Sequence, residues 1–464
     1  MSQSFFNIQA ETNQDLAFIL WQGLLSCDDL DIVLRETSGT SITLLALKKK
    51  VNDIQLKIRE YHLPSYSKVA LCLPRGIDYI ASLLACWEEN LCVCPCVGSM
   101  EEMVPFVDPS LRIDEGISSP NVTFIPLKDP CPVPTSYIIT TSGSSGPFKM
   151  VAVPPFYLPS LWINQSKFFQ VDHTSHTSWM LSPNFDASFS DIGVALSTGS
   201  TLLIATNNDW SSPKRFLKDL EDYRVSHIDA PPSFLNLLRK KDVPSFLKTV
   251  VTGGEVTPSS IVQAWGKDVR WVNVYGPTEA TVCTSMCVLH PYDNDELSLL
   301  GEPLPLVSYA LINEDNPVPH APLPNEEGEL CISGPLAHGY VGNPEKTQES
   351  FPVFDGVRWY KTGDWVKYDE KWGYRFLFRL SRVVKHLGKW VLLDEMEEEL
   401  NNIVGVDQAI VHQKDGVLQG FIKKEDDFPE DVIPYARKMF PQVKKWHMVD
   451  TIPLQNGKIA RGLL

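Results

Sequence analysis

Apolar runs alternate with polar turns along most of the chain, and this pattern predicts a succession of strands and helices. Between residues 66 and 98 it indicates a strand at Val69–Pro74, a helix at Tyr79–Trp87 and a strand at Leu91–Val97. Residues 1–65 are expected to be largely helical. Strands and helices continue to alternate to about residue 350, which predicts an α/β architecture.

Cysteines alternate in the strand predicted at Leu91–Val97. Cys92, Cys94 and Cys96 would share one face of that strand. Metal sites usually have a two-residue gap between cysteines and a second ligand cluster, and neither is visible here. Buried, reduced thiols are therefore the preferred interpretation.

Length and charge narrow the function classes. A chain of 464 residues is long enough for more than one domain, and its 43% hydrophobic and 21% charged residues are typical of globular proteins. The net charge of −16 argues against nucleic acid as a general partner, because phosphates would be repelled. No apolar run approaches the length that spans a bilayer, and Leu16–Trp21 is interpreted as part of a helix rather than as a signal peptide. A cytoplasmic location is expected.

The most informative segment is Thr140–Lys149, which follows a strand predicted at Tyr137–Ile139. Its hydroxyl residues and backbone N–H groups could wrap a phosphate, and Gly143 and Gly146 permit close approach. Lys149 adds a positive charge. The spacing is not that of a Walker A loop. A flexible surface loop is the alternative if the segment is considered alone.

Two further segments carry groups that suit a nucleotide. Asn273–Glu279 follows a predicted strand at Val269–Val272 and offers Tyr275 as a flat face for a base and Glu279 as an oxygen ligand for Mg²⁺. Its alternative is an ordinary Gly-Pro turn. In the second of these segments, Trp359–Asp364, the side chain of Asp364 follows a glycine and could accept hydrogen bonds from ribose. Its alternative is an acidic residue at a surface turn.

A fourth segment, Pro453–Ile459, places Lys458 near the end of the chain. Alone, it would be a solvated lysine after a turn. A phosphate loop, an aromatic residue, a Mg²⁺ ligand, a ribose acceptor and a distant lysine together indicate an ATP site.

These four segments, in this order, resemble the adenylate-forming (AMP-binding) superfamily, which includes acyl-CoA synthetases, luciferases and amino-acid adenylation domains of nonribosomal peptide synthetases. Further matches are Gly253–Glu255, Gly328–Gly334, Ala337–Tyr340 and Pro344–Thr347. The resemblance covers about Val69 to Lys458. It implies the reaction of a carboxylate with ATP to give acyl-AMP and pyrophosphate, usually followed by transfer to a thiol.

The resemblance also implies a role for each matching residue. ATP would be bound by Thr141, Ser142, Gly143, Ser144, Ser145, Gly146, Lys149, Gly254, Glu255, Asn273, Tyr275, Gly276, Asp364 and Arg379. The implied catalytic residues are Lys458, Thr278 and Glu279, with Glu279 also binding Mg²⁺. Lys458 would bridge the substrate carboxylate and the α-phosphate.

The family also implies a domain division. We expect a large AMP-binding domain at residues 1–379 and a small, mobile α+β domain at residues 380–464 that carries Lys458, with Phe378–Ser381 as the hinge. Closure of the two domains would assemble the site.

Phe185–Ser188 resembles the segment with which amino-acid-activating members bind the substrate ammonium group through an aspartate, here Asp186. An acyl chain would suit a buried carboxylate poorly, so an amino acid is favoured. The alternative is that Asp186 caps a helix beginning near Ser188. Alignment adds the pocket positions Ser190, Asp229, Val251, Gly253, Val274, Val282 and Cys283. If Asp229 points inward, it could hold a distal amine or the amine of a β-amino acid.

Departures from the family pattern gather near the hinge and in the small domain. They include Phe378, Ser381, Trp390 and Ala460; His338 and Pro147-Phe148 depart elsewhere. Because that region rotates for thiol transfer in the family, adenylation is predicted more securely than thioester formation on a carrier-protein phosphopantetheine or CoA.

Within the superfamily the chain most resembles the animal β-alanine-activating enzyme group, also filed as acyl-CoA synthetase family member 4. Two other functions stay open. One is an acyl-CoA synthetase for a small carboxylic acid, with Asp186 structural. The other is a degenerate protein that binds nucleotide or a carrier protein without turnover.

Overall fold

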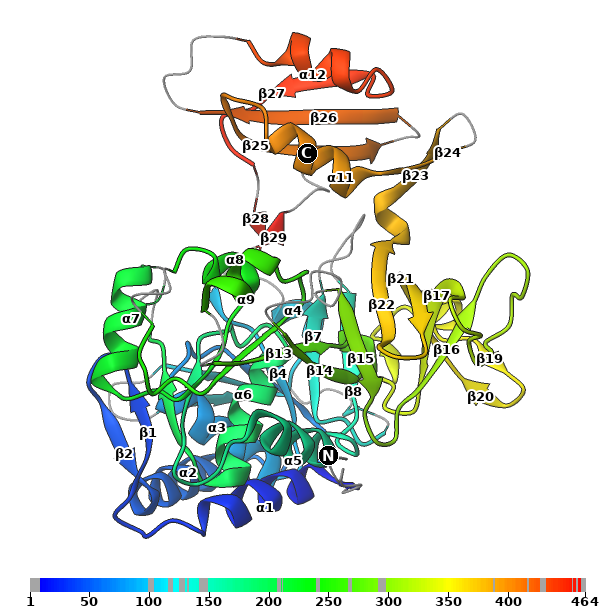
Figure 1. Ribbon diagram of the computed structural model, residues 1–464. Helices are drawn as coiled ribbons and strands as arrows, with labels where there is room; N and C mark the ends of the chain where they lie inside the picture. Colours follow the sequence, from blue (N-terminus) through cyan, green and yellow to red (C-terminus); the bar gives the residue numbers. More distant parts are fainter. Residues whose placement is uncertain are drawn as a thin grey trace. The chain divides into compact units, whose positions relative to one another are not determined.

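A computed structural model describes residues 9–98, 104–115, 120–124, 130–131, 133–141, 149–206, 210, 212–238, 243–265, 269–290, 298–386, 389–414, 417–425, 431–452, 454–455 and 458–459 (Figure 1). The chain divides into two compact units. The first comprises Met1–Thr141, Met150–Thr362 and Lys367–Arg375, and the second Ser142–Lys149, Gly363–Val366 and Phe376–Leu464. The domain boundary after residue 379 stays a prediction.

The helices of the first unit are α1 (Asn13–Leu24), α2 (Leu44–Arg59), α3 (Ile77–Glu88), α4 (Val104–Val107), α5 (Leu158–Phe169), α6 (Ala187–Thr198), α7 (Pro213–Asp222), α8 (Pro232–Leu235), α9 (Ser259–Trp265) and α10 (Pro344–Ser350). Sequence signals set several of their ends. Thr12 and Asp15 form a reciprocal capping box at the start of α1, and Gly199, in the left-handed conformation, ends α6.

The larger sheet has thirteen strands in the order β16-β17-β21-β22-β15-β14-β13-β12-β11-β9-β10-β1-β2. Its strands are β1 (Ile32–Glu36), β2 (Ser41–Thr43), β9 (His176–Trp179), β10 (Thr201–Ile204), β11 (His227–Asp229), β12 (Thr249–Gly253), β13 (Arg270–Tyr275), β14 (Ser285–Leu289), β15 (Leu299–Pro303), β16 (Ser308–Ile312), β17 (Glu327–Ser333), β21 (Tyr360–Asp369) and β22 (Gly373–Arg379). Strands β1, β10, β9, β11, β12 and β13 run parallel, whereas β14 and β15 pair antiparallel.

The smaller sheet of the first unit has seven strands in the order β18-β8-β7-β4-β3-β5-β6. They are β3 (Lys68–Leu71), β4 (Cys92–Pro95), β5 (Leu111–Asp114), β6 (Asn121–Phe124), β7 (Tyr137–Thr141), β8 (Lys149–Val153) and β18 (Gly339–Tyr340). A separate hairpin joins β19 (Val353–Phe354) to β20 (Val357–Arg358).

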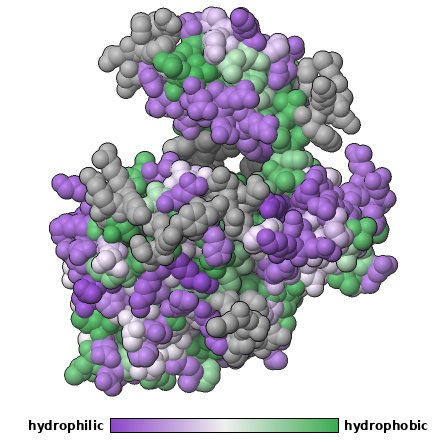
Figure 2. Space-filling view, in the orientation of Figure 1, coloured by the Kyte–Doolittle hydropathy of each residue, from purple (hydrophilic) through white to green (hydrophobic). Residues whose placement is uncertain are grey.

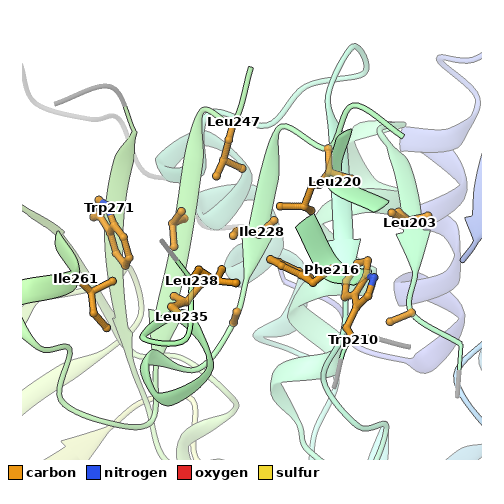
Figure 3. Close-up of a cluster of buried hydrophobic side chains, with 14 of the residues drawn as sticks. Leu203, Trp210, Phe216, Leu220, Ile228, Leu235, Leu238, Leu247, Ile261 and Trp271 are labelled. Carbon is orange, nitrogen blue, oxygen red and sulfur yellow. The ribbon is translucent and has the colours of Figure 1, made fainter. Parts of the chain in front are cut away.

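Apolar side chains fill the space between the parallel strands and the helices that follow them. One cluster joins Phe216 of α7, Ile228 of β11 and Trp271 of β13, among others (Figure 3). These side chains lie at alternate strand positions or on one helix face, as expected for elements that bury a single side. The packed layer holds the ends of the parallel strands in fixed positions.

The structure confirms the strand–helix–strand pattern of residues 66–98 as β3, α3 and β4. The cysteines of β4 are buried together in one cluster, and none of the ten cysteines, all of which lie in the described ranges, forms a disulfide. Two expectations are wrong. Residues 1–65 contain the β1–β2 hairpin as well as helices, and between β14 and β22 the chain forms mainly antiparallel strands rather than alternating helices and strands.

The second unit contains β23 (Val383–His386), β24 (Lys389–Leu392), α11 (Leu393–Asn401), β25 (Val406–Lys414), β26 (Val417–Lys424), α12 (Ile433–Met439), β27 (Lys445–Met448), β28 (Leu454–Gln455) and β29 (Lys458–Ile459). Strands β25, β26 and β27 form one sheet. Helices α11 and α12 bury Leu400 and Ala436 in a core of their own with Val411 and Ile422. This mixture of strands and helices is the small α+β part of the fold.

Hydrophilic residues predominate on the face shown in Figure 2, with hydrophobic ones scattered among them. Among the helices of the described residues, none combines the length and the hydropathy needed to cross a bilayer.

Candidate active site

Three parallel strands end side by side and carry predicted site residues at their carboxyl ends. Strand β11 ends at Asp229, β12 at Gly253 and β13 at Tyr275. Since the strands are parallel and in register, these ends lie along one edge of the sheet. Ligands of open α/β sheets bind outside such edges, so the sheet itself brings together residues from three distant stretches of sequence.

Two glycines allow the backbone to pack closely at this edge. A Cβ at Gly276 would lie 2.5 Å from the Cα of Cys283, and a Cβ at Gly253 would lie 2.5 Å from the carbonyl oxygen of Val274. Either contact is far inside van der Waals range. The two glycines therefore fix how near the predicted pocket residues Val274 and Cys283 come to their neighbours.

The loop after β13 has a strained backbone. Thr281 and Val282 have φ values of 59° and 66°, in the left-handed region that β-branched residues rarely adopt. The buried hydroxyl of Thr281 donates a 2.8 Å hydrogen bond to the carbonyl of Pro335. Such strain persists only where surrounding contacts enforce it, and it clusters at functional sites. The predicted pocket residues Val282 and Cys283 lie in this loop.

Glu279, the predicted Mg²⁺ ligand, is held by Tyr340. Glu279 lies in the short 3₁₀ helix Thr278–Ala280 and is 8% exposed. The hydroxyl of Tyr340 donates a 2.8 Å hydrogen bond to its Oε1, and the N–H of Ala337 donates to its backbone carbonyl. Burial and the Glu279 charge raise the pKa of Tyr340, so this hydroxyl keeps its proton. One carboxylate oxygen is thereby oriented.

The donor set fits a cation that is shared with phosphates. No group of three or more His, Cys, Asp or Glu side chains able to hold a metal occurs among the described residues. Mg²⁺ is commonly bound by one or two protein carboxylates together with substrate phosphates and water. A single oriented carboxylate at Glu279 satisfies that requirement, and an all-protein cage is not needed.

Asp186 stands at the N-terminus of α6 but does not cap it. It occupies the N-cap position with φ −64° and ψ −24°, and its side chain makes no capping hydrogen bond to the helix. The alternative that Asp186 serves as a helix cap is therefore not realised. Ser190 follows four residues later, so both side chains lie on one face of the helix. The Ser190 hydroxyl is buried and has no hydrogen-bond partner within the described part of the chain.

Electrostatic contacts show that the predicted pocket residues are near one another. The negative charges of Asp229 and Asp186 both oppose ionisation of Cys283, whose pKa burial raises to about 12. The Asp186 charge also adds to the burial that raises the pKa of the Tyr137 phenol. Residues of strand β7, helix α6, strand β11 and the loop after β13 thus lie within electrostatic reach of one another.

Sequence reasoning missed Asp191, one residue after Ser190. Asp191 is 8% exposed, and its Oδ2 has no hydrogen-bond partner among the described residues. Burial, and next the charge of Asp229, raise its pKa well above the usual range, while Arg75 acts in the opposite direction. Burial also raises the pKa of Asp229 to about 7. The two carboxyl groups thus interact electrostatically, and such a pair favours sharing a proton or binding a cation.

In the second unit, the structure brings together Asp364 and Arg379. Asp364 lies in β21 and is 3% exposed, which excludes the alternative of a surface turn acid. Arg379, the last residue of β22, places its Nη1 3.2 Å from Asp364 Oδ1. An ion pair of this kind keeps the buried carboxylate charged and oriented.

The other predicted site residues differ in their burial and in their hydrogen bonds. Asn273 Nδ2 donates a 2.8 Å hydrogen bond to the carbonyl of Leu299, so this group joins β13 to β15. Glu255 is exposed and accepts long hydrogen bonds from Ser233, and Gly254 before it has φ +75°. Thr278 begins the 3₁₀ helix that carries Glu279.

The phosphate loop and the terminal lysine are described only in part. Thr141 ends β7 and Lys149 begins β8, while Ser142, Gly143, Ser144, Ser145 and Gly146 lie outside the described residues. The backbone of Lys458 forms β29, paired with β28. A shallow hollow elsewhere in the first unit, lined by Ile19 and Ser197 among others, includes none of the predicted site residues.

Comparison with known proteins identifies the family of this chain. Residues 101–341 match the model of the family described as AMP-binding enzyme. Bacitracin synthase 3 of Bacillus licheniformis is 29% identical over 71% of the chain, and tyrocidine synthase 2 of Brevibacillus parabrevis is 31% identical over 62%. The chain spans only 5% and 8% of the lengths of these two relatives.

A solved four-domain nonribosomal peptide synthetase, bound to AMP and glycine, has the same fold. The two superpose with a TM-score of 0.75 at 19% identity, over 97% of this chain and 36% of that one. Its likeness establishes an α/β fold with a large N-terminal and a small C-terminal part. Because the family model covers more than half of the sequence, the chain belongs to the AMP-binding enzyme family, the adenylate-forming ligases.

Proposed function

We propose that the protein activates an amino acid with ATP, forming an aminoacyl adenylate and releasing pyrophosphate. The activity fits the family, and the choice of an amino acid rests on one observation. Asp186 and Asp229 both act electrostatically on Cys283, so two carboxyl groups lie near this predicted pocket residue. A pocket with this charge attracts an ammonium group and disfavours a purely apolar acyl chain.

Asp186 is the proposed partner of the α-ammonium group. Its side chain is not used to cap α6, and Tyr137 beside it supplies a buried phenol. Asp229, paired with Asp191, lies at the end of β11. A second amine on the substrate, or the amine of a β-amino acid, would find its counter-charge there. This extends the proposal to amino acids whose cationic group lies away from the carboxylate.

The chemical step is a displacement at the α-phosphorus. A carboxylate oxygen forms a bond to phosphorus while the bond to the bridging oxygen of pyrophosphate breaks. No proton is transferred, so the residues act by positioning the reactants and by neutralising charge. Lys149 and the residues from Thr141 to Gly146 are proposed to hold the phosphates, Asp364 the ribose, and Lys458 the charge that gathers at the reacting oxygens.

Glu279 is the proposed ligand for Mg²⁺, which would neutralise phosphate charge. Tyr275 is proposed to stack on the adenine and Thr278 to contact the reacting phosphate. The second half-reaction, transfer of the aminoacyl group to a thiol, would use a carrier-protein phosphopantetheine or CoA as acceptor. The relatives support the activation step more directly than this transfer.

Substrate-dependent exchange of pyrophosphate into ATP tests the proposal. The panel should include neutral, cationic and β-amino acids and short fatty acids. We expect exchange with an amino acid, loss of at least 100-fold in Lys458→Ala and Asp186→Ala, and little change in Lys438→Ala and Asp53→Ala, which alter exposed residues of the same types. Direct nucleotide binding should survive in Lys458→Ala.

Two outcomes would contradict the proposal. Exchange with fatty acids alone would make Asp186 structural and the protein an acyl-CoA synthetase. ATP binding without exchange for any acid, and with no effect of Lys458→Ala, would favour a nucleotide- or carrier-binding protein without turnover.

A further inference from the structure

Cys92 and Cys131 form a thiol pair at the smaller sheet of the first unit, and neither is among the residues predicted to bind ATP or the acid substrate. Cys92 begins β4 and is fully buried, whereas Cys131 is partly exposed and belongs to the stretch that precedes β7. The two side chains are hydrogen-bonded to each other. Both pack against the same apolar cluster.

Backbone hydrogen bonds fix both cysteines against one short stretch of chain. The N–H of Cys92 donates to the carbonyl of Ser67, and the N–H of Cys131 donates to the carbonyl of Tyr66, each at 3.0 Å. Both bonds are ordinary in length. The sheet therefore holds the backbones of the two cysteines against adjacent residues, Tyr66 and Ser67.

The surroundings make the two sulfurs chemically different. The hydrogen bond from Cys92, the Thr135 hydroxyl and the charge of Lys68 lower the pKa of Cys131 to about 7. Burial and the neighbouring thiols Cys131 and Cys94 raise the pKa of Cys92 well above its usual range. Near neutral pH a substantial fraction of Cys131 is thus thiolate, while Cys92 remains the thiol that donates to it. Reactive cysteines are partly exposed, ionised and placed next to a second thiol.

We propose that Cys131 and Cys92 are a peroxide-oxidised modification site that closes into an intramolecular disulfide. The Cys131 thiolate attacks one oxygen of hydrogen peroxide, the O–O bond breaks, and the leaving hydroxide takes a proton to become water. The Cys131 sulfenic acid is then attacked by the sulfur of Cys92. The S–S bond forms, the S–O bond breaks, and the departing hydroxide takes the Cys92 proton as a second water. Two thiols lose two electrons and one peroxide gains them.

The site has a defined place in the fold. A Cys92–Cys131 bond would tie the start of β4 to the stretch that leads into β7. A thiol-based reductant would reverse it. The modification needs neither ATP nor an acid substrate, so it is independent of the proposed adenylation.

The test uses the full chain, reduced and freed of reductant, then treated with one equivalent of hydrogen peroxide and blocked with N-ethylmaleimide. We expect two fewer maleimide adducts by intact mass and a Cys92–Cys131 linked peptide in a non-reducing digest. Cys131→Ser should abolish the link. Cys331→Ser is the matched control, because burial raises the pKa of that thiol to about 12, and it should leave the link unchanged.

A second measurement needs no variant. The rate at which iodoacetamide alkylates Cys131 in the native chain, followed by peptide mass against pH, should rise through a midpoint near 7, whereas an ordinary exposed thiol has its midpoint near about 8.5. The proposal is overturned if the bond joins Cys131 to Cys94, if Cys131 stops at a sulfinic acid with Cys92 unmodified, or if the midpoint matches an ordinary thiol.

Discussion

The Tyr340 hydroxyl donates a 2.8 Å hydrogen bond to Glu279 Oε1. The bond links the 3₁₀ helix after β13 to β18, which pairs in turn with β8 at Val151 and Ala152. The predicted metal ligand thus depends on a residue 61 positions further along the chain. A carboxylate held in this way loses little freedom when it binds a cation.

Removing that hydroxyl should weaken the binding of Mg²⁺ more than it lowers the exchange rate at saturating Mg²⁺. A charge-assisted hydrogen bond is worth roughly 1–2 kcal/mol, so Tyr340→Phe should raise the Mg²⁺ concentration for half-maximal exchange about 5- to 30-fold. Titration of exchange activity with Mg²⁺ measures this. Tyr435→Phe, at an exposed tyrosine of α12, should behave as the parent. Equal Mg²⁺ requirements in all three proteins would show that Tyr340 does not orient a metal ligand.

Loss of the Arg379 side chain should weaken nucleotide binding. Arg379→Gln leaves the buried Asp364 carboxylate without its ion-pair partner, and breaking such a pair disturbs both orientation and solvation. We expect the KM for ATP to rise about 10-fold. Steady-state exchange at varied ATP tests this, with the exposed Arg437→Gln as the control. An unchanged KM for ATP would separate Asp364 from the ribose site.

The carboxyl pair should make stability fall as pH rises. Burial raises the pKa of Asp229 in the folded chain to about 7, against 3.8 for an ordinary aspartate. Its stabilising protonated form is therefore fully present below about pH 4 and is lost as pH rises through 7. The free energy of unfolding of Asp229→Asn, relative to that of the parent, should therefore rise by on the order of 1–3 kcal/mol between pH 4 and pH 8.

Denaturant unfolding at a series of pH values measures that difference. Asp53→Asn, at an exposed aspartate of α2, should parallel the parent at every pH. A difference between Asp229→Asn and the parent that stays constant from pH 4 to 8 would contradict a raised pKa in the folded state.

Because the loop after β13 is strained, replacing Val282 with glycine should cost unusually little free energy of unfolding. Val282→Gly relieves a left-handed valine but removes a buried side chain, and these effects of roughly 1–2 kcal/mol nearly cancel. Val250→Gly, at a fully buried valine in the extended strand β12, should cost about 3 kcal/mol or more. Unfolding free energies of the two variants provide the test. Similar large losses would mean that the loop is not strained.

Local sequence patterns indicate strands, helices and single candidate residues. They do not indicate which residues distant in sequence contact one another. The strands at β3, β4, β7 and β13 follow from apolar runs, and Glu279 and Asp364 from short motifs. Nothing local indicated Tyr340 as the partner of Glu279, because that contact is created by sheet pairing.

Asp191 was missed for a similar reason. Its significance comes from burial beside Asp229 on another element, and no spacing rule signals that. The β1–β2 hairpin was missed because its apolar run, Ile32–Leu34, is short and its pairing with β10 is far away in sequence. Burial of Asp364 could not be distinguished from a surface turn until the sheet order was known.

The pairing of β18 with β8 also bears on how the chain folds during synthesis. Tyr340 and Val151 are neighbours in the ladder although about 190 residues separate them, and contacts of such long range slow folding. A ribosome adding roughly 5–20 residues per second would need about 10 to 40 seconds to make the intervening chain. The nascent protein therefore holds an unpaired edge at β8 throughout that interval, and we expect chaperone protection there until β18 emerges.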